Sequence, residues 1–170
     1  GVTANKMTED ERDEAMERLS FTTDIGDLSD RDLVVEAIIE DEDMKVDLFR
    51  ELDQVLNNSD AILASNTSSI PIMKLGTATS RPEQVIGIHF FNPVPVLRLV
   101  ELVESLMTSE ETSLRAEAFA GNVLSKRVIK SQDRAGFVVN ALLIPYLLSA
   151  IRMMESGFAS ADDIDIGMVE

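Results

Sequence analysis

The chain of 170 residues is strongly acidic, with 31 aspartate and glutamate residues against 15 lysine and arginine residues and a formal net charge of −16. Such a surface repels phosphate backbones, so we expect no nucleic-acid partner. The sequence contains no cysteine, which excludes a disulfide framework, a thiolate nucleophile and a cysteine-based zinc site. With no recognisable signal peptide, these features predict a cytoplasmic protein.

The first part of the chain alternates between helical and strand patterns. Residues 8–11 have the form of a capping box and begin an acidic surface helix that runs to about Leu19. Residues 21–23 are a short strand candidate. Residues 33–39 are a stronger one, because strands buried on both faces of a parallel sheet are almost continuously apolar. From Asp41, a predicted N-cap, apolar residues recur at helical spacing.

The rest of the chain changes from alternating elements to helices alone. Strands are predicted at 61–64, 85–91, 97–103 and 128–129, and helices begin around Pro71, Ser109 and Ser160. The longest apolar stretch, residues 137–154, is interrupted by three polar or proline residues, which favours a buried helix over a membrane span. We therefore expect no membrane contact, and an α/β unit that passes into an α-helical domain near Gly136.

His89 is the only histidine, and it lies near the end of a predicted strand, next to a proline-containing loop. Open α/β sheets bind ligands beyond the carboxyl ends of their strands, so this position suits a general base. The alternative is a core histidine whose hydrogen bonds are satisfied. Glu101 is the natural carboxylate to orient the imidazole, because a charge amid apolar residues on the next strand needs a partner. An outward-facing glutamate on an edge strand is the other interpretation.

Three further polar residues are candidates for a site. Asn140 lies in an apolar helix, where a buried amide needs partners, and a substrate oxygen is one of several. Asn66 and Ser68 follow a predicted strand, in a turn that suits a phosphate, a ribose or a carbonyl but whose residues are also common turn formers. The eight glycines form no G-x-G-x-x-G motif. The residues alone therefore predict an acidic α/β chain with a candidate His-Glu pair.

Three motifs, in this order and at this spacing, closely resemble the 3-hydroxyacyl-CoA dehydrogenase family: residues 64–69 (ASNTSS), 89–95 (HFFNPVP) and 136–140 (GFVVN). A further match at residues 143–147 looks most like the stand-alone 3-hydroxybutyryl-CoA dehydrogenases. The resemblance implies an α/β fold in two parts. Residues 1–133 would be the C-terminal part of a Rossmann-like NAD-binding domain, and residues 134–170 the start of an all-α substrate and dimerisation domain.

The resemblance also implies a reaction, the oxidation of a (3S)-3-hydroxyacyl-CoA, in particular 3-hydroxybutyryl-CoA, to the 3-oxoacyl-CoA, or the reverse reduction. His89 would be the general base and Glu101 would orient it. Ser68 would hydrogen-bond the reacting oxygen, and Asn140 would help to position the substrate. An imidazole suits this step, because hydride can leave C3 only as the hydroxyl proton is drawn off.

The implied cofactor is NAD, with NADP as an alternative. Glu40 and Lys45 match family residues near the NAD ribose, and Asn66, Ser68 and Asn92 match those around the nicotinamide end. The glycine-rich turn would lie upstream of the first residue. We therefore expect the chain to be a section of a longer protein, a homodimer when complete, and inactive when isolated.

Other hypotheses stay open beside this one. The chain could be the dehydrogenase segment of a multifunctional fatty-acid oxidation protein, or a relative that acts on a sugar acid. It could also be a non-catalytic scaffold that has lost NAD.

Overall fold

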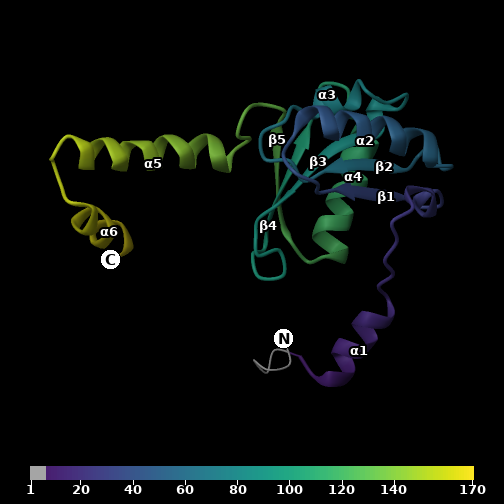
Figure 1. Cartoon of the computed structure of the whole chain (residues 1–170), viewed down its shortest axis with the longest axis horizontal. Helices are drawn as coiled ribbons and strands as arrows, with labels where there is room; N and C mark the ends of the chain where they lie inside the picture. Colours follow the sequence, from purple (N-terminus) through teal and green to yellow (C-terminus); the bar gives the residue numbers. More distant parts are fainter. Residues whose placement is uncertain (1–6) are drawn as a thin grey trace.

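The computed structural model describes residues 7–170, and Figure 1 labels its elements. The strands are β1 (Leu33–Glu36), β2 (Ile62–Ser65), β3 (Val85–Phe90), β4 (Leu99–Glu104) and β5 (Arg127–Gln132). The α-helices are α1 (Glu9–Glu17), α2 (Glu42–Val55), α3 (Ile72–Gly76), α4 (Glu110–Ala118), α5 (Val139–Glu155) and α6 (Ala161–Val169). Shorter helical turns are η2 (Ile25–Leu28), η3 (Pro82–Gln84) and the π-helical η4 (Phe119–Val123). Within residues 7–170, no helix combines the length and the apolar character that crossing a membrane requires.

The five strands form one mixed sheet in the order β1-β2-β3-β4-β5. The first three strands are parallel to one another, β4 is antiparallel to β3, and β5 is parallel to β4. The chain reverses at β4 because residues 91–98 join it to β3 without a helix, and a parallel pair needs a longer crossover connection. The carboxyl ends of β1, β2 and β3 therefore share one edge with the beginning of β4.

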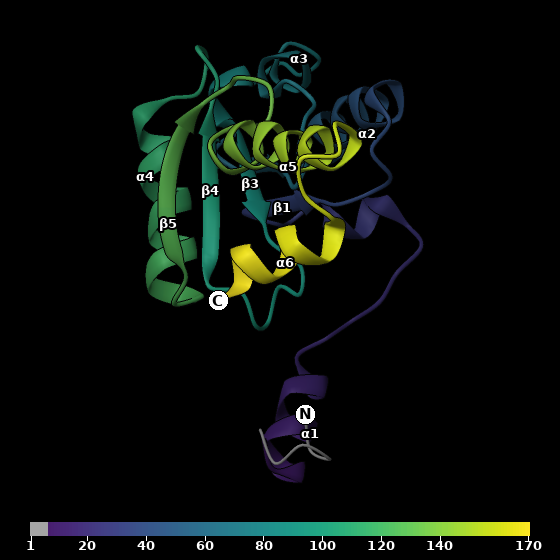
Figure 2. The same ribbon diagram turned by 90° about the vertical axis from the view of Figure 1, so that its left-hand side faces the viewer.

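Helices cover both faces of the sheet, as Figure 2 shows, with α4 on one side and α2 and α3 on the other. Neighbouring residues of a strand point to opposite faces, so Leu63 and Val85 pack with α2 and α3, whereas Ile62 and Ile86 pack with α4. The strands are apolar on both faces for this reason. The predicted α/β fold, a Rossmann-like sheet followed by a helical region, is confirmed.

The strand predicted over residues 21–23 is wrong, because these residues form no strand and the Phe21 side chain is 85% exposed. The Thr22 hydroxyl donates to the Asp27 carboxylate at 2.6 Å and accepts from the backbone N–H of Asp24. Local side-chain bonds of this kind compete with strand pairing. They hold the chain in a turn immediately before η2.

The strand predicted over residues 33–39 is shorter, since β1 ends at Glu36. The Glu36 carboxylate accepts a hydrogen bond from the backbone N–H of Ile38 at 2.6 Å, which turns the chain out of the strand. The main-chain oxygen of Glu36 still accepts from the N–H of Asn66, so β1 remains joined to the end of β2.

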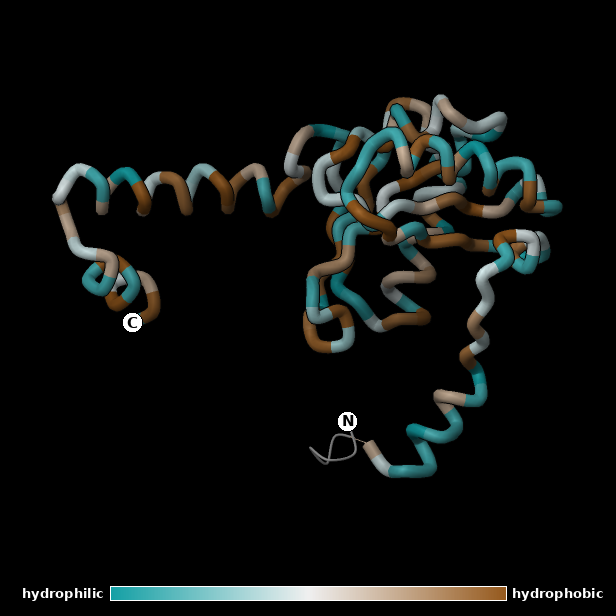
Figure 3. The backbone as a smooth tube through the Cα atoms, viewed as in Figure 1, coloured by the Kyte–Doolittle hydropathy of each residue, from teal (hydrophilic) through white to brown (hydrophobic). Residues whose placement is uncertain are grey.

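The helix α5 projects away from the α/β layers and leads into α6 (Figure 1). Figure 3 shows hydrophobic residues recurring along α5. These side chains are exposed: Leu142 is 72% exposed, and neither α5 nor α6 has a buried residue. We expected a buried helix over residues 137–154, and that expectation is wrong for the described residues. The physical reason is that α6 is the main element that packs against α5 within residues 7–170.

Candidate active site

His89 and Glu101 form a buried pair at the edge of the sheet where β3 ends and β4 begins. The two residues are register partners on antiparallel strands, so their side chains share one face of the sheet. The distance from His89 Nδ1 to Glu101 Oε2 is 2.9 Å, and the Glu101 side chain is 0% exposed. A carboxylate acceptor fixes the imidazole proton on Nδ1, which leaves Nε2 with the lone pair that a general base needs.

Glu101 also binds the first turn of α5. Its other oxygen, Oε1, accepts hydrogen bonds from the backbone N–H groups of Val138 and Val139, each at 3.0 Å. The first amides of a helix have no partner within the helix and attract negative charge. These two amides and the His89 ring therefore satisfy a buried carboxylate that would otherwise be costly. One side chain connects the histidine to the helix that carries Asn140.

Aromatic rings surround the imidazole. The Phe91 ring centroid lies 4.6 Å from that of His89, and the Phe137 ring lies 5.6 Å away in an edge-on arrangement. Phe137 has a positive φ of 50° at the point where the chain leaves the sheet for α5. A non-glycine residue in that region is strained and needs support from its surroundings, which its buried ring provides.

The structure brings Ser68 and Asn140 to one open cleft of about 440 Å³ between the turn after β2 and the start of α5. His89 and Glu101 do not line this cleft, but they contact the residues immediately before Asn140. Asn66 joins the turn to β3, because its Oδ1 accepts from the backbone N–H of Phe90 at 2.8 Å. The cleft is lined by Ser68, Ser69, Ala135, Gly136, Asn140, Ala141, Ile144 and Pro145.

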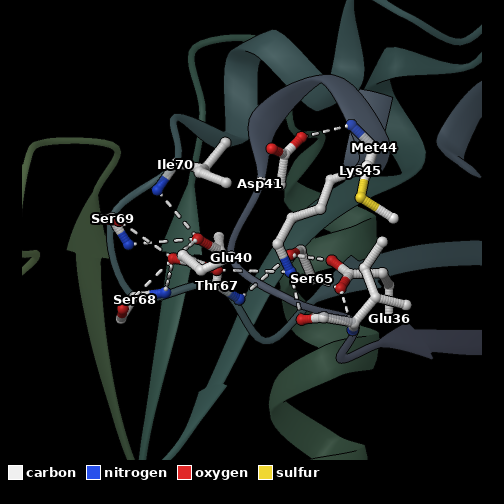
Figure 4. Close-up of polar contacts among 11 residues, drawn as sticks. Glu36, Glu40, Asp41, Met44, Lys45, Ser65, Thr67, Ser68, Ser69 and Ile70 are labelled. Carbon is white, nitrogen blue, oxygen red and sulfur yellow. Dashed lines mark hydrogen bonds and ion pairs between the residues drawn. The ribbon is translucent and has the colours of Figure 1, made fainter. Parts of the chain in front are cut away.

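Glu40 and Lys45 belong to a polar network that links β1, α2 and the serine turn (Figure 4). The Lys45 ammonium is 1% exposed and lies 2.5 Å from Glu36 Oε1 and 3.4 Å from Glu40 Oε2. Burial alone would raise the pKa of Glu40, but hydrogen bonds from Thr67, Ser68 and Ser69 and the Lys45 charge lower it to about 2. Glu40 is therefore a stable anion. The predicted contacts of Glu40 and Lys45 with a cofactor stay predictions.

The sequence reasoning missed Glu36 and Ser65, which complete this network. The Ser65 hydroxyl donates to Glu36 Oε2 at 2.6 Å, and both side chains are buried. A glutamate within the apolar strand β1 needs a partner for the same reason as Glu101, and that signal was available from the sequence. Asn92, the remaining predicted site residue, is exposed and precedes a cis peptide bond to Pro93 in the loop after β3. No group of three potential metal ligands occurs within residues 7–170.

Comparison with known proteins identifies the family of this arrangement. Residues 1–134 match the family model described as 3-hydroxyacyl-CoA dehydrogenase, NAD binding domain, and residues 136–170 match the C-terminal domain of the same family. The chain is 61% identical to a 3-hydroxybutyryl-CoA dehydrogenase of Mycobacterium tuberculosis over 99% of its own length and 59% of that protein.

Solved structures have the same fold. The crystal structure of M. tuberculosis FadB2 superimposes with a TM-score of 0.93 at 62% identity, covering 95% of this chain and 57% of that one. The (S)-3-hydroxybutyryl-CoA dehydrogenase of Ralstonia eutropha superimposes with a TM-score of 0.94 at 41% identity, covering 98% of this chain and 58% of that one. The chain thus spans somewhat more than half the length of these relatives. The resemblance found in the three sequence motifs is confirmed, and the chain belongs to the 3-hydroxyacyl-CoA dehydrogenase family.

Proposed function

We propose that the complete protein oxidises (3S)-3-hydroxybutyryl-CoA to the 3-oxoacyl-CoA with NAD, or catalyses the reverse reduction, and that this chain supplies the proton-transfer groups. The observation that carries the proposal is the buried His89-Glu101 pair, joined at 2.9 Å at the carboxyl end of a parallel strand. Its relatives from M. tuberculosis and R. eutropha are 3-hydroxybutyryl-CoA dehydrogenases, which supports this substrate.

His89 acts as the general base in this proposal. Its Nε2 accepts the proton of the 3-hydroxyl group, and the resulting imidazolium is stabilised by the Glu101 carboxylate at Nδ1. Ser68 donates a hydrogen bond from its hydroxyl to the reacting oxygen, while Asn140 holds the substrate from the other side of the cleft. Bound NAD would supply the acceptor for the hydride that leaves C3 of the substrate. In the reverse direction, Nε2 returns the proton to the same oxygen.

The residues present fit one end of that cofactor. The parallel strands β1, β2 and β3 have their carboxyl ends at one edge of the sheet, and open α/β sheets bind dinucleotides at this edge. Asn66 uses its side-chain oxygen for Phe90, so its amide NH2 is left as a donor, and this group and the Ser68 hydroxyl both suit a nicotinamide carboxamide or ribose. The sequence has no glycine-rich turn for a pyrophosphate, so only the nicotinamide end is assigned to this chain.

The proposal includes a homodimer of the complete protein, with acyl-CoA as substrate, acting in the cytoplasm. The exposed apolar side chains of α5 support an interface, because contiguous apolar surface of this kind is usually covered by another subunit or domain.

The test is a His89→Ala substitution in the protein expressed from its complete reading frame. Loss of the base is expected to lower kcat by about 100-fold or more, with a small change in the melting temperature. Turnover of 3-hydroxybutyryl-CoA is followed by NADH absorbance, and the melting temperature by calorimetry. A parental protein that fails to reduce NAD with this substrate would refute the proposed function, and a His89→Ala variant with the parental rate would refute the assignment of the base.

A further inference from the structure

We propose that Glu40 is a positioning residue for Ser68: its carboxylate fixes the turn that presents the Ser68 hydroxyl to the reacting oxygen. The inference rests on the proposed function, which assigns that oxygen to Ser68. It gives Glu40 a role in addition to the cofactor contact implied by the resemblance.

Four donors of the serine turn converge on a single oxygen of Glu40, as Figure 4 shows. Oε1 accepts from the Thr67 hydroxyl at 2.5 Å, from the Ser68 backbone N–H at 2.9 Å and from the Ser69 hydroxyl at 3.1 Å. The Ser68 hydroxyl lies further away, at 3.3 Å. Residues 67–69 are thus held by one carboxylate, which lies in the neighbouring loop between β1 and α2.

The charge on Glu40 is not cancelled by the neighbouring lysine. The Lys45 ammonium lies closer to Glu36, at 2.5 Å, than to Glu40, at 3.4 Å, so two carboxylates share one cation. One net negative charge remains in the cluster, and donors from the turn must stabilise it. The buried Ser65 hydroxyl donates to Glu36, and Glu36 accepts from Lys45. These contacts fix the position of the ammonium and therefore its distance to Glu40.

The Ser68 hydroxyl is the weakest of the four contacts and carries only one proton. A carboxylate oxygen has about two lone pairs, and the Thr67 hydroxyl and the Ser68 amide occupy them at shorter distances. The Ser68 hydroxyl can therefore turn its proton to a substrate oxygen while its backbone stays bound to Glu40. The geometry holds the residue rigidly and leaves its reacting group free.

A double-mutant cycle, measured as kcat at saturating NAD, tests whether Glu40 acts through Ser68. Glu40→Ala, Ser68→Ala and the double variant are made in the protein expressed from its complete reading frame. Glu40→Ala is expected to lower kcat by about 10- to 100-fold through misplacement of Ser68, and Ser68→Ala by about 100-fold. Because Glu40 acts through Ser68, the double variant should match Ser68→Ala within about twofold.

The dissociation constant of NADH, from nicotinamide fluorescence, separates the two roles further. A change in this constant in Glu40→Ala reports the cofactor contact, whereas the positioning role is read from kcat at saturating NAD. Asp43→Asn is the matched control, because it removes a carboxylate from the first turn of α2 that makes no contact with the serine turn within the described residues. Multiplicative losses in the double variant, or weaker NADH binding with an unchanged kcat, would overturn the inference.

Two further measurements keep the inference testable. Should Glu40→Ala not fold, Glu40→Gln retains one acceptor oxygen without the charge, and the same non-additivity with Ser68→Ala is expected. Should the parental protein show no dehydrogenase activity, the proposed function fails, and amide hydrogen exchange of Ser68 decides the positioning role. Loss of the Glu40 acceptor should then speed that exchange by at least about fivefold, the equivalent of one hydrogen bond. Unchanged exchange would refute the role of Glu40.

Discussion

Replacement of Glu101 by glutamine tests whether this carboxylate fixes the tautomer of His89 while it also binds the first turn of α5. Glutamine keeps an oxygen for the backbone N–H groups of Val138 and Val139, which now lie 3.0 Å from Oε1. Its amide NH2 then faces His89 Nδ1, and two donors cannot share a hydrogen bond. The ring must accept at Nδ1 and carry its proton on Nε2, where it can no longer take a proton from the substrate.

The magnitude follows from this change of tautomer. An acid-to-amide change at the orienting residue of a serine-protease triad lowers kcat by about 10⁴-fold for the same reason, so we expect a loss of roughly 10³- to 10⁴-fold for Glu101→Gln. Stability should change far less, because three charge-assisted hydrogen bonds become neutral ones. A loss of about 1–3 kcal/mol corresponds to a fall in the melting temperature of less than about 10 °C.

The assay compares kcat for 3-hydroxybutyryl-CoA with the calorimetric melting temperature in the protein expressed from its complete reading frame. Glu104→Gln, on the same strand, is the matched control, since Glu104 contacts Lys130 and Ser113 and not the imidazole. Glu101→Ala should lower both quantities, because it leaves three buried donors without an acceptor. A Glu101→Gln variant that keeps the parental rate would show that the tautomer of His89 does not limit the reaction.

Two further predictions concern stability. Because the pKa of Glu40 is lowered from 4.5 to about 2, its contribution is complete above pH 4.5 and lost as the pH falls towards 2. In urea unfolding, Glu40→Gln should therefore be less stable than the parent at neutral pH, and the gap should close on acidification; a gap that grows at low pH would contradict this. Gly136→Ala should cost about 2–3 kcal/mol, since the residue has a φ of +76° and a Cβ would lie 2.9 Å from the Ala141 nitrogen. Gly157→Ala, with a φ of +72° and open space around it, should cost only about 1–2 kcal/mol by the same unfolding measurement, and equal losses would argue against the contact.

Helix beginnings were predictable from the sequence because they depend on adjacent residues. Thr8, Asp41, Ser109 and Ser160 each accept a backbone N–H as helix caps. Residues 8–11 were predicted as a capping box and Asp41 as an N-cap, and helices were predicted to begin around Ser109 and Ser160. The strand predicted at residues 21–23 failed for a related reason: threonine favours strands in general, but here its hydroxyl had a nearer partner in Asp27.

The His89-Glu101 pair was predictable because a charged residue within an apolar strand needs a partner. Glu101 could be paired with His89 because consecutive strands place their residues side by side. Its two bonds to α5 could not be predicted, because they depend on how the chain turns at Phe137. The need of Glu36 for a partner was visible in the sequence, but its partners Lys45 and Ser65 could not be predicted, because they lie on other elements and depend on the register between β1 and β2.

The boundary between the two parts of the chain passes through the candidate site, not beside it. Residues 1–134 match the NAD-binding domain and contain both His89 and Glu101, but the amides that stabilise Glu101 belong to Val138 and Val139. Without them, a side chain that is 0% exposed would keep the His89 ring as its single hydrogen-bond partner, and an oxygen without a partner is costly in the interior. The position of the Glu101 oxygen at 2.9 Å is what fixes the imidazole proton on Nδ1. The orientation of the imidazole therefore depends on the first turn of α5, so a shift of that helix would alter proton transfer without any change in the histidine itself.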